Sequence, residues 1–119
     1  MTSTLLSIMQ MPADKRYTHL LAQAKTTQLL WILTDEHGCV MLNTEDEDCV
    51  PVWPSQDYAQ YWATGDWADC KAQSIGVNEW LERWTTGLEG DELLVVACPN
   101  PDEPGLVLEP DMFDEDLRR

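Results

Sequence analysis

The apolar run from Leu93 to Cys98 is the feature of this sequence that most restricts the fold. It follows Glu92 and stops at Pro99, so it has the length of a strand rather than that of a helix. A strand with one solvated face alternates apolar and polar side chains, whereas a strand covered on both faces is apolar throughout. The stretch from Glu92 to Cys98 therefore predicts the central strand of a sheet that is covered on both sides.

Shorter β-rich runs predict the neighbours of this strand. Residues 28–34 and 39–43 are joined by a turn that ends in Gly38, which can adopt a positive φ, and they predict a hairpin. Residues 49–53 predict a strand at a sheet edge or with irregular pairing, because Pro51 lacks a backbone donor. Two further strands are expected at residues 70–75 and 106–109.

Helical periodicity accounts for most of the remaining chain. It predicts helices over residues 3–11, from Pro12, after Ser55, from Asn78 to Gly87, and from Pro110. The helix from Pro12 should dock its apolar face on the sheet. The apolar faces of the last four helices comprise Tyr17, Leu20, Leu21 and Ala24; Tyr58, Tyr61 and Trp62; Trp80, Leu81 and Trp84; and Met112, Phe113 and Leu117.

The order of these elements favours the α+β class. A chain of 119 residues has the size of one domain, and we expect residues 1–119 to form a single α+β domain. Because the predicted connections between strands are short hairpins, we expect a mostly antiparallel sheet of about five or six strands with helices packed on it.

The charge of the chain restricts its partners. The sequence has 22 acidic residues against seven basic ones, which gives a net charge of −15. Such a surface repels the phosphates of nucleic acids and the headgroups of anionic membranes, and it attracts basic proteins. We therefore expect a basic protein partner, and neither nucleic acid nor membrane.

The cysteines and the N-terminus indicate the compartment. The four cysteines contain no C-x-x-C pair, and each lies in or beside an apolar stretch, so buried free thiols are favoured over disulfides. The first residues lack the features of an export signal, and no apolar run approaches the roughly 20 residues of a membrane helix. We expect a cytoplasmic protein.

The sequence lacks the usual motifs of catalysis and cofactor binding. It has no G-x-S-x-G, no H-E-x-x-H and no closely spaced glycines ahead of a helix. His19 is expected at a helix surface and His37 in a turn, which makes a catalytic base at either position the weaker interpretation. The acidic run from Glu45 to Asp48 lacks the spacing of a calcium loop. We predict no catalytic residue, no cofactor and no metal, and an enzyme that uses a carboxylate or a cysteine is the third hypothesis.

Several short strings resemble a known family. The likeness runs from about Tyr17 to the Pro110 segment, and its most specific part is a Trp-Pro pair followed by a Ser-capped aromatic helix. On these strings the chain resembles the bacterial family catalogued as domain of unknown function 2750, which implies a compact bacterial domain and no activity. Trp80 departs from the phenylalanine of the family pattern, and the acidic residues 44–48 are not a family hallmark. The strings are Val50-Pro51-Val52-Trp53-Pro54-Ser55, Tyr58-Ala59, Ser74-Ile75, Trp80-Leu81, Trp84 and Gly87-Leu88.

Two functions compete on this evidence. The first is a protein-interaction module, similar to an immunity or inhibitor protein, in which acidic residues steer a basic partner and Trp67 anchors it. Trp67 stands in a polar loop, where its ring is either folded back as a plug or exposed as an anchor. The alternative is a small-molecule sensor with a pocket lined by Trp53, Tyr58, Trp62 and Trp67. The predicted partner-binding residues are Glu45, Asp46, Glu47, Asp48 and Trp67.

Overall fold

The computed structural model describes residues 7–8, 10–36, 38–43, 48–99 and 105–118, and it confirms the α+β class. The helical segments are α2 (Ala13–Thr27), α3 (Gln56–Trp62), η1 (Gly65–Trp67), α4 (Val77–Glu79), η2 (Trp80–Trp84), α5 (Thr85–Gly90) and α6 (Pro110–Arg118). The strands are β1 (Leu29–Asp35), β2 (Gly38–Cys39), β3 (Leu42–Asn43), β4 (Asp48–Val52), β5 (Lys71–Gly76), β6 (Leu94–Ala97) and β7 (Leu106–Leu108). The predicted helix over residues 3–11 falls mostly outside the described residues.

The described strands form two sheets rather than the one that we expected. One has the order β2-β1-β5 and is antiparallel, which confirms the hairpin across Gly38. The other has the order β3-β4-β6-β7 and is antiparallel except for the parallel pair β4–β6. An antiparallel bridge between Trp31 and Trp53 connects the two sheets. The apolar strand β6 lies inside its sheet, as its sequence predicts.

The Pro51 strand was predicted to lie at a sheet edge or to pair irregularly. The edge position is wrong for β4 as a whole, whereas the pairing is irregular at Pro51, which has a described strand partner on one side only. Strand β4 lies between β3 and β6, and Pro51 is opposite Val96 in the parallel pair. The proline is tolerated because β3 is very short and pairs only with Asp48 and Cys49. Its missing N–H therefore removes no bond from the pairing between β3 and β4.

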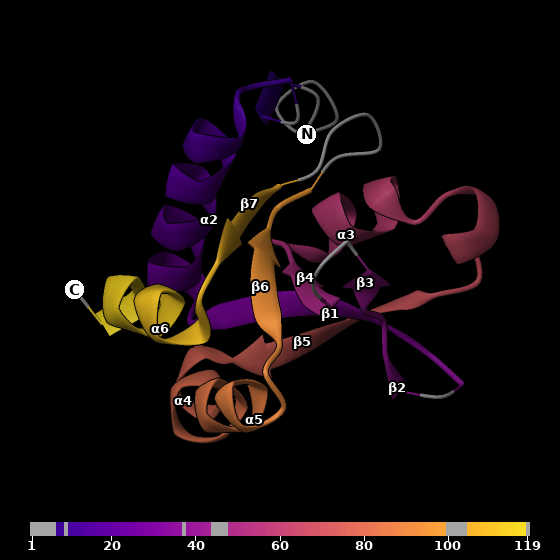
Figure 1. Ribbon diagram of the computed structural model, residues 1–119. Coiled ribbons are helices and arrows are strands. Elements are labelled where there is room, and N and C mark those ends of the chain that lie inside the picture. The colour runs from indigo at the N-terminus through magenta and orange to yellow at the C-terminus, as the bar shows by residue number, and fades with distance from the viewer. Residues whose placement is uncertain (1–6, 9, 37, 44–47, 100–104, 119) are drawn as a thin grey trace.

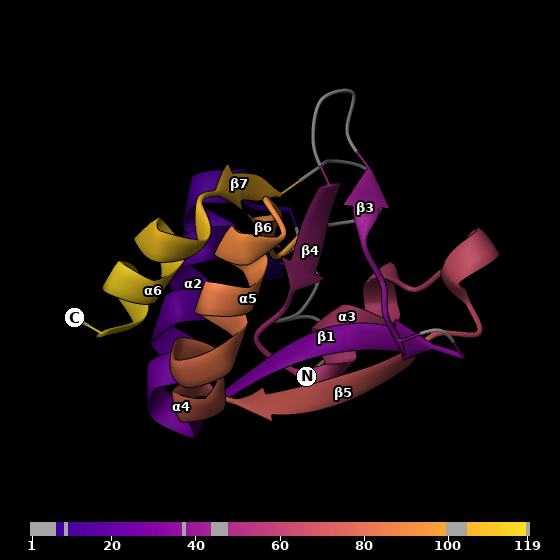
Figure 2. The ribbon, with the colours of Figure 1, turned by 60° about the horizontal axis from the view of Figure 1, so that its bottom comes forward.

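Figures 1 and 2 show how the helices surround the strands. Helices α2, α4, α5 and α6 lie together on one side of the strands, and α3 lies on the other side. Tyr17, Leu20 and Ala24 of α2 are buried, which confirms the predicted face of this helix. The hydroxyl of Tyr17 donates a hydrogen bond to Asp116 of α6, so the two helices are also connected by a polar contact.

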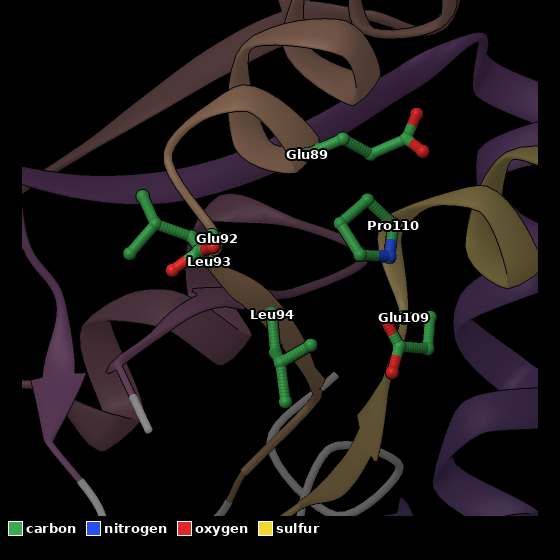
Figure 3. Close-up of a pocket in the computed structure, with 6 residues that line it drawn as sticks. All are labelled: Glu89, Glu92, Leu93, Leu94, Glu109 and Pro110. Atoms are coloured by element: carbon green, nitrogen blue, oxygen red, sulfur yellow. The ribbon is translucent and has the colours of Figure 1, made fainter. Parts of the chain in front are cut away.

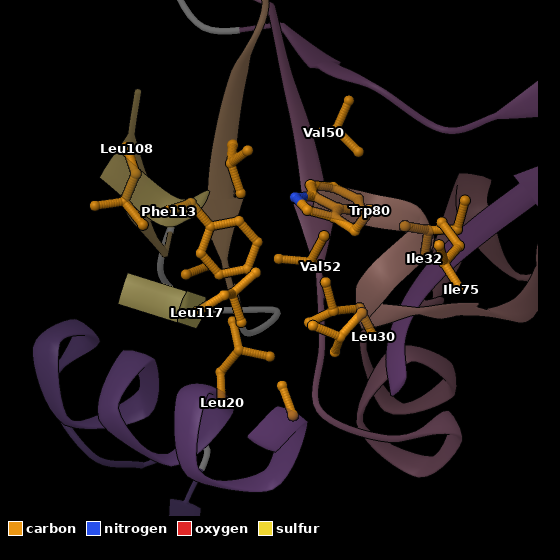
Figure 4. Packing of buried hydrophobic residues seen from close by; sticks show 14 of the residues in the cluster. Leu20, Leu30, Ile32, Val50, Val52, Ile75, Trp80, Leu108, Phe113 and Leu117 are labelled. Carbon is orange, nitrogen blue, oxygen red and sulfur yellow. The ribbon is translucent and has the colours of Figure 1, made fainter. Parts of the chain in front are cut away.

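Alternation along the strands divides the interior into two hydrophobic clusters. In β1, Leu30 and Ile32 belong to the cluster under α2, α5 and α6, whereas Leu33 belongs to the cluster under α3. Successive strand residues point to opposite faces, so one strand can supply both clusters. The first cluster is centred on Trp80, which meets Phe113 edge-on at 5.7 Å (Figure 4).

The indole N–H of Trp80 is a polar group inside this core. Its indole nitrogen has no hydrogen-bond partner within the described part of the chain, although the side chain is fully buried. Figure 4 shows the nitrogen-bearing edge of Trp80 on the side of Phe113, and the two rings are inclined by 81°. The two rings are therefore in the edge-to-face arrangement that aromatic pairs favour.

Two predictions about the helices need correction. The helix that starts after Gly76 does not end at Gly87, because α4, η2 and α5 run on without a break to Gly90. Met112 is not an apolar contact of α6, since 51% of it is exposed, whereas Phe113 and Leu117 are buried. Among the helices that the structure describes, none combines the length and the apolar character required to cross a membrane.

Candidate functional site

The predicted partner-binding residues do not come together as one described site. Glu45, Asp46 and Glu47 lie outside the described residues, and Asp48 is exposed at the start of β4. Trp67 is half-buried in η1, where its ring lies 5.5 Å from that of Trp62. Of the two interpretations of Trp67, the geometry supports the plug.

The aromatic residues that were expected to line a pocket form a closed cluster. Trp53 is fully buried, Tyr58 and Trp62 are almost fully buried, and the rings of Trp53 and Trp62 lie 5.5 Å apart. Their cluster also contains Leu33, Ala59 and Cys98. These buried side chains therefore form part of the core under α3.

A buried polar corner holds the end of β6 beside this cluster. Cys98 has a φ of +48°, a conformation that non-glycine residues rarely adopt. Arg16 is fully buried and donates from Nε to the carbonyl oxygen of Cys98 at 2.9 Å. The indole nitrogen of Trp53 donates to the carbonyl oxygen of Pro99 at 3.0 Å. These two bonds fix the backbone that leaves the sheet at this point.

The titratable groups of this corner are poorly suited to nucleophilic chemistry. Burial raises the pKa of the Cys98 thiol to about 12, and nearby Arg16 opposes that rise only in part. Burial also raises the pKa of the Tyr58 hydroxyl, with the neighbouring Cys98 and Asp57 adding to it. His19 lies 3.2 Å from that hydroxyl, and burial lowers its pKa. At neutral pH the thiol is therefore protonated, and the thiolate is the reactive form.

Metal binding is the next candidate chemistry for the described part of the chain. Within the described ranges, no group of three or more His, Cys, Asp or Glu side chains is arranged to hold a metal ion. One small polar hollow joins the β1–β2 turn to the start of β5 and is lined by Thr34, Asp35, Glu36, Asp69 and Lys71.

An acidic hollow of about 350 Å³ lies where α5, β6 and α6 meet. Figure 3 shows Glu89 from α5, Glu92 from the following turn and Glu109 from the segment before α6 arranged around it. All three glutamates are exposed, and none of their carboxylates has a hydrogen-bond or ion-pair partner among the described residues. Its apolar lining is Leu93, Leu94 and Pro110. We call this surface the acidic hollow.

An apolar groove of about 340 Å³ lies on the other side of the same turn. The half-buried Trp84 and the exposed Met41 line it. Arg83 of η2 and Asp91, which follows α5, are its charged lining residues. Trp84 stacks on the buried Trp80 at 5.1 Å with the rings inclined by only 7°. We call this surface the apolar groove; its lining consists of Met41, Val50, Arg83, Trp84, Gly87, Leu88, Asp91 and Leu93.

The helix geometry explains the position of Trp84. Residues Trp80 to Trp84 form a π-helical segment inside an otherwise α-helical stretch. π-Helical turns are rare in proteins, but those that occur are often found at functional sites. The segment holds Trp80 in the core and Trp84 above it at the groove, so the inner tryptophan supports the outer one.

Sequence patterns alone did not reveal either surface. Gly87-Leu88-Glu89-Gly90-Asp91 has the composition of a helix end and a turn, and this interpretation concealed the lining residues that it contains. Glu109 follows β7 in the chain and reaches the acidic hollow only because β7 pairs with β6. The one local signal was the density of carboxylates from Glu89 to Glu92, which is weak in so acidic a chain.

Comparison with curated proteins finds no match for this chain. Residues 17–117 match the family model described as protein of unknown function (DUF2750). The match confirms the resemblance carried by the Trp53-Pro54 string, and it spans the aromatic cluster, the acidic hollow and the apolar groove. The chain therefore belongs to the DUF2750 family of proteins of unknown function.

Proposed function

We propose that this protein is a single-domain interaction module that binds a basic protein partner through the acidic hollow. The observation that supports this proposal is the convergence of Glu89, Glu92 and Glu109 on one concave surface, without partners among the described residues, in a chain of net charge −15. The three side chains give one concave surface several negative charges, and a cation supplied by a partner would be attracted to it.

The shape of the hollow favours a lysine or arginine side chain as the occupant. Both side chains carry an apolar stem and a charged end. In the acidic hollow the stem would contact Leu93, Leu94 and Pro110 while the charge meets the surrounding carboxylates. The overall negative charge would also accelerate the approach of a basic partner, since long-range attraction raises association rates.

The same proposal covers the biological setting. We propose an immunity-like or inhibitor-like role in the bacterial cytoplasm, in which the module covers a basic surface of another protein and does not bind nucleic acid. Cys49, Cys70 and Cys98 are buried free thiols, as the sequence predicts, and this supports a reducing compartment. The side chain of Cys39 is not among those that the structure describes.

Small-molecule binding is the second candidate function. The observation that favours it is the apolar groove, whose volume of about 340 Å³ is at the lower end of that of ligand pockets. The aromatic cluster around Trp53 no longer supports it, because that cluster is closed. An apolar ligand without charge would bind equally well at low and high salt.

The interaction proposal is tested by neutralising the acidic hollow. The variant Glu89→Gln/Glu92→Gln/Glu109→Gln changes the net charge from −15 to −12 while it keeps the side-chain shapes. Wild type and variant are immobilised and exposed to a lysate of the source organism at about 50 and about 300 mM salt, because screening weakens exposed charge pairs. We expect wild type to retain a basic protein in stoichiometric amount and the variant to lose it.

A control variant separates the site from the total charge. Asp57→Asn/Glu79→Gln/Glu82→Gln removes the same charge from exposed positions that line neither the hollow nor the groove. It should retain the partner as wild type does. Equal loss in both triple variants would mean that only the net charge matters, and retention by the hollow variant would refute the proposed site.

A further inference from the structure

We propose that the apolar groove receives an apolar side chain from the same partner segment whose lysine or arginine enters the acidic hollow. This inference rests on the proposed function and extends it to the chemistry of the partner. The occupant is a basic protein segment with a leucine-like or phenylalanine-like residue next to its basic residues. Neither a basic segment without that residue nor a neutral apolar molecule would satisfy both surfaces.

The two surfaces adjoin each other. Leu93 lines both the acidic hollow and the apolar groove, and Leu88 and Glu89 follow one another along α5, one on each surface. Residues 87–94 therefore form a ridge with the groove on one side and the hollow on the other. A single extended segment that crosses this ridge can place neighbouring side chains in both.

Charge complementarity selects a basic segment for the groove as well. Asp91 lies on the groove at the end near the acidic hollow, and it has no ion-pair partner among the described residues. Arg83 lines the same groove about two helical turns away from Asp91. The basic residues of the partner should therefore lie toward Asp91 and the hollow, with the apolar residue between them and Arg83.

Gly87 leaves the groove open at one point of its lining. It lies inside α5, where glycine is less favourable than almost any other residue. A Cβ atom added there would meet no atom within 4 Å, and its φ lies outside the left-handed range, so neither space nor backbone conformation requires glycine. A side chain at this position would extend into the groove that Gly87 lines.

This glycine also supplies the test. Gly87→Phe should fold normally and fill the groove, whereas Thr86→Phe is the matched control. Thr86 belongs to the same helix, is exposed, and lines neither surface. Far-UV circular dichroism and urea unfolding establish that both variants are folded before binding is measured.

Binding is measured by calorimetry with three synthetic peptides. The probe has leucines next to lysines, one control replaces the leucines with serine, and the other replaces the lysines with glutamine. We expect wild type to bind the leucine–lysine probe at least about tenfold more tightly than either control peptide. Gly87→Phe should weaken binding of the probe by about tenfold, down to the affinity of the serine control, and Thr86→Phe should leave it unchanged.

The outcomes separate this inference from the proposed function. If Gly87→Phe binds the probe as wild type does, the groove is not the apolar subsite and the inference is wrong, even where the triple glutamine variant has lost binding. If the triple glutamine variant keeps its affinity for the probe and for the serine control, the proposed function itself fails. Tight binding of the glutamine control would show a groove for neutral apolar ligands, which also overturns the inference.

Discussion

The two tryptophan-rich regions of this protein have opposite surroundings. Under α3, Trp53 and Trp62 are closed in by neighbouring residues and by the plug of Trp67. Beside α5, Trp80 is just as buried as Trp53, but its stacking partner Trp84 faces the apolar groove. The aromatic content is similar in both regions, so aromatic residues in the sequence do not by themselves mark an open surface. What distinguishes the regions is whether another element covers the outermost ring.

The sharpest test of this comparison is truncation of one tryptophan in each region. Trp53→Ala should lower the free energy of unfolding by about 3–5 kcal/mol, because it empties a buried site and removes the bond to the Pro99 carbonyl. Trp84→Ala should cost only about 1–2 kcal/mol, since the half-buried ring already contacts solvent. Urea unfolding measures both, and a larger loss for Trp84→Ala would contradict the distinction between closed and open regions.

A second test measures the stability of the protein at alkaline pH, where the Cys98 thiol of the closed region ionises. Burial raises the pKa of Cys98 to about 12 from an ordinary value of 9.0. Folding therefore favours the neutral thiol, and the corresponding stability is complete below pH 9 and declines as the pH rises toward 12. By about pH 10.5 the loss should reach roughly 2 kcal/mol.

The control for this pH dependence is Cys98→Ala. This variant lacks the thiol and should show a flatter stability curve above pH 9 than wild type. The same burial should make Cys98 slow to react with a thiol reagent until urea unfolds the protein. Fast reaction in the native state at neutral pH would show that this region opens more easily than its packing indicates.

The smallest expected effect belongs to the open region. Gly87→Ala should raise the free energy of unfolding by about 0.5–1 kcal/mol, because alanine favours the helix and its methyl group meets no atom within 4 Å. Thermal and urea unfolding measure the gain. A destabilised variant would mean that the groove is narrower than the structure indicates.

Most local elements of this fold could be predicted from the sequence. The apolar face of α2, the hairpin at Gly38 and the apolar strand β6 were all visible as periodicity and turn residues. These properties depend on residues close together in the chain. The stacking of Trp80 on Trp84 also follows from their spacing on one helix.

Predictions failed where a distant segment decides the outcome. Pro51 suggested an edge or an irregular pairing, and β4 in fact lies between β3 and β6, with one-sided pairing at Pro51 because β3 pairs only with the other end of the strand. Gly87 suggested a helix end, yet α5 continues to Gly90. The partner-binding run from Glu45 to Asp48 stays a prediction, since residues 45–47 lie outside the described residues, and the acidic hollow uses other glutamates that are scattered along the chain.

The sequence by itself determined the α+β class, the family, the acidic character and the positions of most helices and strands. Only the tertiary structure decided which residues share a surface. Glu89 and Glu109 are 20 positions apart in the chain, and they meet because β7 returns beside β6 and leads into α6. Local patterns reflect the backbone geometry of one segment, whereas a binding surface depends on how separate segments pack, and no periodicity within either segment encodes that contact.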